Sequence, residues 1–94
     1  MGMNFEWDEV KNRLNLERHG VSFEVAQEAF FDRYRVIVPD EKHSQNEKRF
    51  FCFGYDGNDV LTVRFTPRNG GVRIYGAGYW RKGKRIYAEK NHLH

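Results

Sequence analysis

Residues 48–79 read KRFFCFGYDGNDVLTVRFTPRNGGVRIYGAGY, and this stretch carries the clearest strand and turn signals of the chain. Residues 48–55, 60–66 and 72–79 are rich in apolar, aromatic and β-branched side chains, which favour strands. The sequences DGND and PRNGG between them are strong hairpin signals. The stretch therefore predicts three antiparallel strands joined by two hairpins.

The register of these hairpins predicts which side chains share a face of the sheet. We pair Tyr55 with Val60 and Thr66 with Gly71, across the two loops. The core face then holds Leu61, Val63, Phe65, Val72 and Ile74, joined by Phe50 and Cys52. The opposite face holds Thr62, Arg64, Thr66, Arg73, Tyr75, Ala77 and Tyr79, with Phe51 and Phe53 further across. A single bulge would reverse this assignment beyond it.

The same register sets Arg64 directly opposite Arg73. Like charges in this position repel each other by roughly a few tenths of a kcal/mol or more. Either an anion or an acidic partner lies between them, or both guanidinium groups reach water or acids such as Glu47. The residues leave both interpretations open.

The first twenty residues predict a capped helix. Asp8 is a good N-cap, residues 9–18 are compatible with a helix, and Gly20 is placed to end it. The helix carries the apolar side chains of Val10 and Leu14 on one face.

Other segments complete the predicted order of elements. Residues 4–7 form a short first strand, and Ser22 caps a second helix. Residues 35–38 form a further strand, and a last helix runs from about residue 84 to 91, with Gly83 weakening its start. We expect one α+β domain over residues 1–94, in which an antiparallel sheet carries two N-terminal helices on one face and ends in a short C-terminal helix.

Charge is divided unevenly along the chain. Residues 64–90 carry eight basic side chains and one acid, a balance of +7, whereas residues 1–63 have a balance of −4, giving the net charge of +3. Aromatic side chains are interleaved with the basic ones in this stretch. Cations attract phosphate and flat rings stack on unpaired bases. The pattern favours nucleic-acid binding, and RNA rather than duplex DNA.

Composition excludes several other classes of protein. Cys52 is the only cysteine, which fits a reducing cytosol. No apolar run approaches the roughly 20 residues of a membrane span, and the polar N-terminus does not suit a signal peptide. The histidines and Cys52 lack the spacing of metal ligands. We expect a cytoplasmic protein that contacts no membrane and needs no metal or other cofactor.

Several motifs together resemble the BrnT toxin family. They are Phe5-Glu6-Trp7-Asp8, then Lys11, Asn12, Asn15, Arg18-His19-Gly20-Val21-Ser22-Phe23, Phe30-Phe31-Asp32, His43-Ser44, Glu47, Arg49, Phe53-Gly54, the strand over residues 63–66, and Arg73-Ile74. The resemblance implies a ribonuclease toxin of a bacterial type II toxin–antitoxin system, with a RelE-like fold. It also implies a BrnA antitoxin that neutralises the toxin and supplies the DNA-binding part, so DNA is reached only through the antitoxin.

One position departs from the family pattern. The arginine that usually ends the last strand is replaced by Gly78. Arg81 or Lys82 could restore the charge from nearby. If neither does, cleavage is weak or absent. The alternative function is therefore a non-catalytic module that binds an antitoxin or nucleic acid and acts as a transcriptional corepressor.

The candidate chemistry is RNA cleavage by its own 2′-OH, without a metal. Such a reaction needs cations on the phosphate oxygens and groups that transfer protons. For these catalytic roles we select Arg64, Arg73, Tyr75, Tyr79, Arg81 and Lys82, with Glu47 and His43 as loop alternatives. For RNA binding we select Lys11, Trp80, Lys84 and Arg85. His19 is interpreted first as a helix cap, and Trp7 as part of the core.

Overall fold

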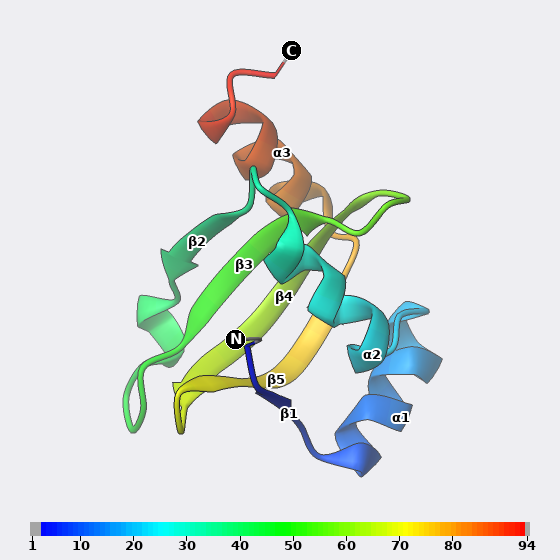
Figure 1. Ribbon diagram of the computed structural model, residues 1–94, viewed down its shortest axis with the longest axis vertical. Helices are drawn as coiled ribbons and strands as arrows, with labels where there is room; N and C mark the ends of the chain where they lie inside the picture. The colour runs from blue at the N-terminus through cyan, green and yellow to red at the C-terminus, as the bar shows by residue number, and fades with distance from the viewer. Residues whose placement is uncertain (1–2, 94) are drawn as a thin grey trace.

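The computed structural model describes residues 3–93 and shows an α+β fold with a five-stranded sheet (Figure 1). The strands are β1 (Phe5–Glu6), β2 (Val36–Pro39), β3 (Phe50–Tyr55), β4 (Val60–Arg68) and β5 (Gly71–Gly78). The helices are α1 (Glu9–His19), α2 (Phe23–Ala26) and α3 (Arg81–Lys90), with short 3₁₀ turns η1 (Gln27–Phe31) and η2 (Glu41–His43). In the sheet the order is β1-β5-β4-β3-β2. None of the helices within residues 3–93 is long and apolar enough to cross a membrane.

The sheet is mixed, so the prediction of a wholly antiparallel sheet was wrong. Strands β2 to β5 are antiparallel neighbours, but β1 runs parallel to β5, with Phe5 opposite Val72 and Glu6 opposite Arg73. A parallel neighbour requires a long connection. Along the chain, α1, α2 and strands β2 to β4 separate β1 from β5. A strand of two residues also carries no pattern that indicates its partner.

Helix α1 begins and ends as predicted. The Asp8 carboxylate accepts hydrogen bonds from the backbone amides of Val10 and Lys11, and Gly20 adopts a left-handed φ of 71° at the C-cap. However, the apolar face does not turn inward, because Val10 is 61% exposed and Leu14 is 38% exposed. The helix therefore packs on the sheet through other side chains.

Two asparagines make the buried contacts of α1. The Asn12 side chain accepts a hydrogen bond from the Phe23 amide at 2.8 Å, which fastens α1 to the start of α2. Asn15 donates to the carbonyls of Val21 and Ala77 at 2.9 Å each and accepts from the Ala77 amide at 3.2 Å. Asn15 thus satisfies both backbone groups of a β5 residue that lies beyond the short β1. Polar pairing, rather than an apolar stripe, positions this helix.

A bulge separates the two halves of the β4–β5 hairpin. The predicted pairing of Tyr55 with Val60 is confirmed in the β3–β4 hairpin. In β4–β5, however, Phe65 pairs with Ile74 while Arg64 pairs with Gly76, so Tyr75 is an extra residue in β5. The prediction that Arg64 lies opposite Arg73 was therefore wrong.

The bulge also reverses the faces of the residues that follow it. The predicted core residues before it are confirmed: Leu61, Val63, Phe65, Val72, Ile74 and Cys52 are buried, and Phe50 packs against them. Ala77 is fully buried in the same core and Tyr79 packs against it, although both were predicted on the open face. Trp7 packs against this core as predicted, with its ring edge to face with Phe23.

Helix α3 begins at Arg81, three residues earlier than predicted. The reason is Gly83, which packs directly on the sheet. A Cβ atom at this position would lie 1.9 Å from Thr62 Oγ1 and 2.9 Å from Phe53 Cδ1. The glycine allows close packing and does not interrupt the helix. Because Thr62 and Phe53 point away from the core face, α3 covers the side of the sheet opposite to α1 and α2.

Candidate functional site

A basic hollow lies where the side chains of α1 reach the outer face of β4 and β5. Its volume is about 330 Å³, and its lining includes Lys11, Arg18, His19, Arg64, Tyr75 and Trp80. The cations come from both halves of the chain, whereas Lys11 was the only basic residue selected from outside residues 64–90. The hollow concentrates positive charge next to aromatic rings, which suits an anion joined to a flat apolar group.

The bulge in β5 aims the Tyr75 ring into this cluster of cations. The guanidinium carbon of Arg64 lies 5.1 Å from the Tyr75 ring centroid, and that of Arg49 lies 4.3 Å from it. Both distances permit cation–π attraction. The Tyr75 hydroxyl and Arg49 Nε are buried without a hydrogen-bond partner within the described part of the chain. The Tyr75 ring is therefore in contact with two guanidinium groups from different segments of the chain.

A second hollow adjoins the first and shares Arg64 and Trp80 with it. This histidine hollow is lined by His43, Phe51, Arg64 and Trp80. His43 Nδ1 lies 2.8 Å from Asp40 Oδ2, and the Asp40 side chain is only 5% exposed whereas His43 is 44% exposed. A carboxylate accepts hydrogen bonds, so Nδ1 is the donor in this contact and Nε2 takes no part in it. Asp40 therefore holds the imidazole by its Nδ1 edge.

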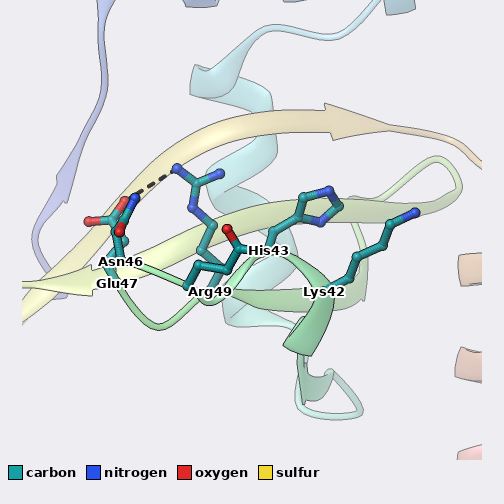
Figure 2. Close-up of a pocket in the computed structure, with 6 residues that line it drawn as sticks. Lys42, His43, Asn46, Glu47 and Arg49 are labelled. Carbon is teal, nitrogen blue, oxygen red and sulfur yellow. Dashed lines mark hydrogen bonds and ion pairs between the residues drawn. The ribbon is translucent and has the colours of Figure 1, made fainter.

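The loop after η2 forms a pocket that His43 also lines, with a volume of about 440 Å³. Figure 2 shows the lining side chains of Lys42, His43, Asn46, Glu47 and Arg49. Glu47 is exposed and pairs with Arg49 at 3.4 Å. Glu47 therefore contacts the guanidinium that lies over Tyr75, which gives the loop a link to the basic hollow.

Trp80 packs against Gly78, the position at which we noted the departure from the family pattern. Its ring lies against Gly78, where a Cβ atom would come within 2.6 Å of the ring carbons. The ring edge also meets His19, with centroids 5.2 Å apart and planes at 75°. His19 thus faces the basic hollow, and the helix is capped by Gly20 instead of by the histidine that we had interpreted as its cap. Any side chain at position 78 would displace Trp80.

The structure brings together only part of the predicted site. Arg64, Tyr75, Trp80 and Lys11 line the same hollow. Arg73 instead pairs with Glu6 at 2.9 Å, beside β1. Lys84 pairs with Asp59 at 2.6 Å, in the turn between β3 and β4.

Tyr79 also lies apart from the basic hollow. Its hydroxyl donates a hydrogen bond to the Asp56 carboxylate. Burial and this carboxylate raise the pKa of Tyr79 to about 12. On α3, Arg81 and Arg85 are exposed, and Lys82 lines an apolar groove next to Trp80. These side chains do not line the basic hollow.

Arg18, Asp40 and Arg49 belong to the site, but the sequence analysis gave none of them a site role. Arg49 stands just before β3, and nothing in the local pattern indicates that it reaches Tyr75 on β5. The spacing of Asp40 and His43 was a usable signal, because residues three apart in a tight turn come into contact. Within residues 3–93, no group of three or more His, Cys, Asp or Glu side chains could hold a metal ion. Metal-free chemistry stays a prediction.

Comparisons with known proteins show the family and the fold of the chain. Residues 7–83 match the family model of the ribonuclease toxin BrnT of type II toxin–antitoxin systems. A comparison with curated proteins gave no match. Among solved structures, the chain is similar in fold to the ribonuclease toxin BrnT of Brucella abortus, with a TM-score of 0.65 and 19% identity over 84% of this chain and 97% of that one. Because the family model spans most of its 94 residues, the chain belongs to the BrnT family of ribonuclease toxins of type II toxin–antitoxin systems.

Proposed function

We propose that this chain is an endoribonuclease toxin that cuts RNA without a metal and thereby inhibits translation. The observation that carries the proposal is the arrangement around Arg64 and Trp80. His19 lines the basic hollow and His43 lines the histidine hollow, and the two hollows share Arg64 and Trp80. A phosphate held at Arg64 would thus have one imidazole available from each hollow.

Arg64 is the residue that we assign to the scissile phosphate. It is half-buried, and its planar guanidinium can contact two phosphate oxygens at once. Lys11 and Arg18 line the same hollow and add charge from α1. Preorganised cations of this kind stabilise the extra negative charge that develops on the phosphate in the transition state.

The two histidines complete the proposed reaction. Nε2 of His43 accepts the proton of the 2′-OH, whose oxygen then bonds to phosphorus while the bond from phosphorus to the 5′-oxygen breaks. Protonated His19 gives its proton to the departing 5′-oxygen. The products are a 2′,3′-cyclic phosphate and a 5′-OH end. Histidine suits both roles because its charge changes near neutral pH.

Cleavage of single-stranded RNA in the presence of EDTA tests the proposal. Wild-type protein should leave 2′,3′-cyclic phosphate ends, and His43→Ala and Asp40→Asn should both slow cleavage. Asp40→Asn keeps the shape of the side chain but no longer imposes the tautomer on His43. The matched control is His92→Ala, which removes a histidine from the end of the chain, outside both hollows. Activity that disappears with EDTA would reject the metal-free mechanism.

We also propose that a BrnA-like antitoxin covers the basic hollow. The family is one of toxin–antitoxin systems, which implies an antitoxin partner. A hollow that gathers Arg18, Arg64 and Trp80 favours an acidic contacting segment and salt-sensitive association. Contact with DNA would then occur only through the antitoxin. We place both the complex and the RNA substrate in the cytoplasm. Residues 1–94 would act as one domain. The RelE-like part of the expectation stays a prediction.

Co-expression tests this partner. The neighbouring gene product should be retained with the toxin in a pull-down and should stop RNA cleavage. Protection of Arg64 and Trp80 from solvent in the complex would support the proposed mode of neutralisation. Binding that leaves both residues exposed while cleavage continues would contradict it.

A non-catalytic corepressor is the second candidate, and Gly78 favours it. The strand-end arginine is missing, and neither Arg81 nor Lys82 lines the basic hollow to replace it. Under this alternative the chain binds its antitoxin tightly, strengthens repression at the operator and leaves RNA intact at any enzyme concentration. The same cleavage assay therefore separates the two functions.

A further inference from the structure

An apolar groove of about 420 Å³ lies between α3 and the outer face of the sheet. Its lining includes Val38, Phe51, Phe53, Trp80, Lys82 and Ile86. The rings of Phe51 and Phe53 are stacked, with centroids 5.8 Å apart and an interplanar angle of 16°. Its volume is within the roughly 300–1,000 Å³ that small-molecule sites occupy, so the groove can admit a flat ring system.

The groove continues into the proposed catalytic centre. Phe51 and Trp80 line it and also line the histidine hollow, in which Arg64 and His43 lie. An occupant that spans both must join an anion, held at Arg64, to a flat apolar group that enters the groove. A nucleotide has this combination of groups.

Trp80 is held in place before any ligand arrives. Its ring rests on Gly78 and its edge meets His19, so little side-chain freedom is left to lose on binding. Lys82 adds a cation to the lining, where a neighbouring phosphate of the same strand would pass. Gly78 thus leaves room for a rigid aromatic surface next to Arg64.

We propose that this groove binds one unpaired nucleobase of the RNA, next to the phosphate at Arg64, and that Trp80 determines base preference. The inference rests on the proposed function, because it takes the phosphate at Arg64 as given. It differs from that function in assigning a substrate subsite that makes no bond and transfers no proton.

The test measures the affinity for a short, single-stranded 2′-O-methyl oligonucleotide, which cannot be cleaved, and for versions lacking one base at each position in turn. In the wild-type protein, loss of one particular base should weaken binding roughly tenfold, as stacking on an aromatic side chain predicts. In Trp80→Ala the same loss should change binding less than about twofold. Trp80→Phe should restore part of the base dependence, and Tyr34→Ala, which removes an exposed aromatic elsewhere, should behave as wild type.

Ile86→Trp provides a second variant that fills the groove from α3 and leaves Trp80 in place. It should abolish the base dependence as Trp80→Ala does. Equal base dependence in wild type and both variants, or no binding of the oligonucleotide at all, would overturn the proposal. A variant that loses affinity for the antitoxin but not for the oligonucleotide would also overturn the proposal, since the groove would then bind the protein partner. Cleavage of the all-ribose strand is measured in parallel, because base dependence without cleavage rejects the proposed ribonuclease and retains the groove.

Discussion

Replacing Arg64 by alanine is expected to slow RNA cleavage far more than replacing Arg73, although the sequence analysis selected both residues. Arg64 lines the basic hollow and lies 5.1 Å from the Tyr75 ring. Arg73 pairs with Glu6 at 2.9 Å outside that hollow. The comparison therefore tests whether the bulge at Arg64 defines the site.

The magnitude follows from the charge that Arg64 supplies. One unit charge about 4 Å from a phosphate oxygen contributes about 4 kcal/mol near a protein surface. Lys11 and Arg18 remain in the variant and retain part of this stabilisation. A loss of about 2–4 kcal/mol is expected, which lowers kcat by roughly 30- to 900-fold.

Arg73→Ala removes a pair whose side chains are 32% and 41% exposed. Solvent screening limits its contribution to roughly 0.2–1 kcal/mol of stability, and the cleavage rate should stay within about twofold of wild type.

The assay is single-turnover cleavage of a labelled single-stranded RNA with EDTA present, and thermal unfolding of each variant checks that the fold is intact. Arg64→Lys should fall between wild type and Arg64→Ala, because it keeps the charge but loses the bidentate geometry. The reasoning fails if Arg64→Ala cleaves at the wild-type rate, or if Arg73→Ala is equally damaged.

Four further outcomes are expected. RNA affinity should fall with salt, with a log–log slope of about −0.7 for each phosphate neutralised, and a flat titration series would contradict this. Tyr79→Phe should leave cleavage unchanged through the neutral pH range, because a pKa of about 12 keeps the phenol protonated there, while stability falls by roughly 0.5–1.5 kcal/mol in denaturant titrations. Gly83→Ala should lower the melting temperature despite alanine's higher helix propensity, because its Cβ would lie 1.9 Å from Thr62 Oγ1. Asn15→Ala should destabilise the fold by roughly 1–3 kcal/mol for each backbone group of Ala77 left unpaired, measured by chemical unfolding.

Local signals were sufficient where neighbouring residues alone decide the structure. Asp8 and Gly20 were correctly assigned as the ends of α1, because a cap needs only a side-chain acceptor and a residue that tolerates positive φ. The pairing of Tyr55 with Val60 was also correct, since a short turn sets the register of the strands it joins.

The register of the β4–β5 hairpin could not be predicted from local signals. Gly76, Ala77 and Gly78 are small enough for either face of a sheet, so the pattern could not reveal the extra residue at Tyr75. Contacts from distant segments decide the faces instead. Asn15 of α1 binds both backbone groups of Ala77, and Trp80 lies against Gly78.

The distribution of charge shows the same limit. Residues 64–90 carry a balance of +7, yet Arg73 and Lys84 pair with acids from the first part of the chain. The basic hollow draws Lys11 and Arg18 from α1 in exchange. Charge along a sequence predicts the partner class, because long-range attraction depends on total charge, but it does not locate the site.

Residue patterns alone were enough to predict the α+β class, the caps of α1, most of the core and membership of a ribonuclease toxin family, because these depend on local preference, apolar periodicity and family motifs. Tertiary packing is what brings His19 and His43 into hollows that share Arg64, and what lays the Trp80 ring against Gly78. These residues come from α1, the η2 turn, β4 and the segment before α3. Their proximity depends on one bulge and on helix packing across the sheet, and neither produces a periodic pattern in the sequence.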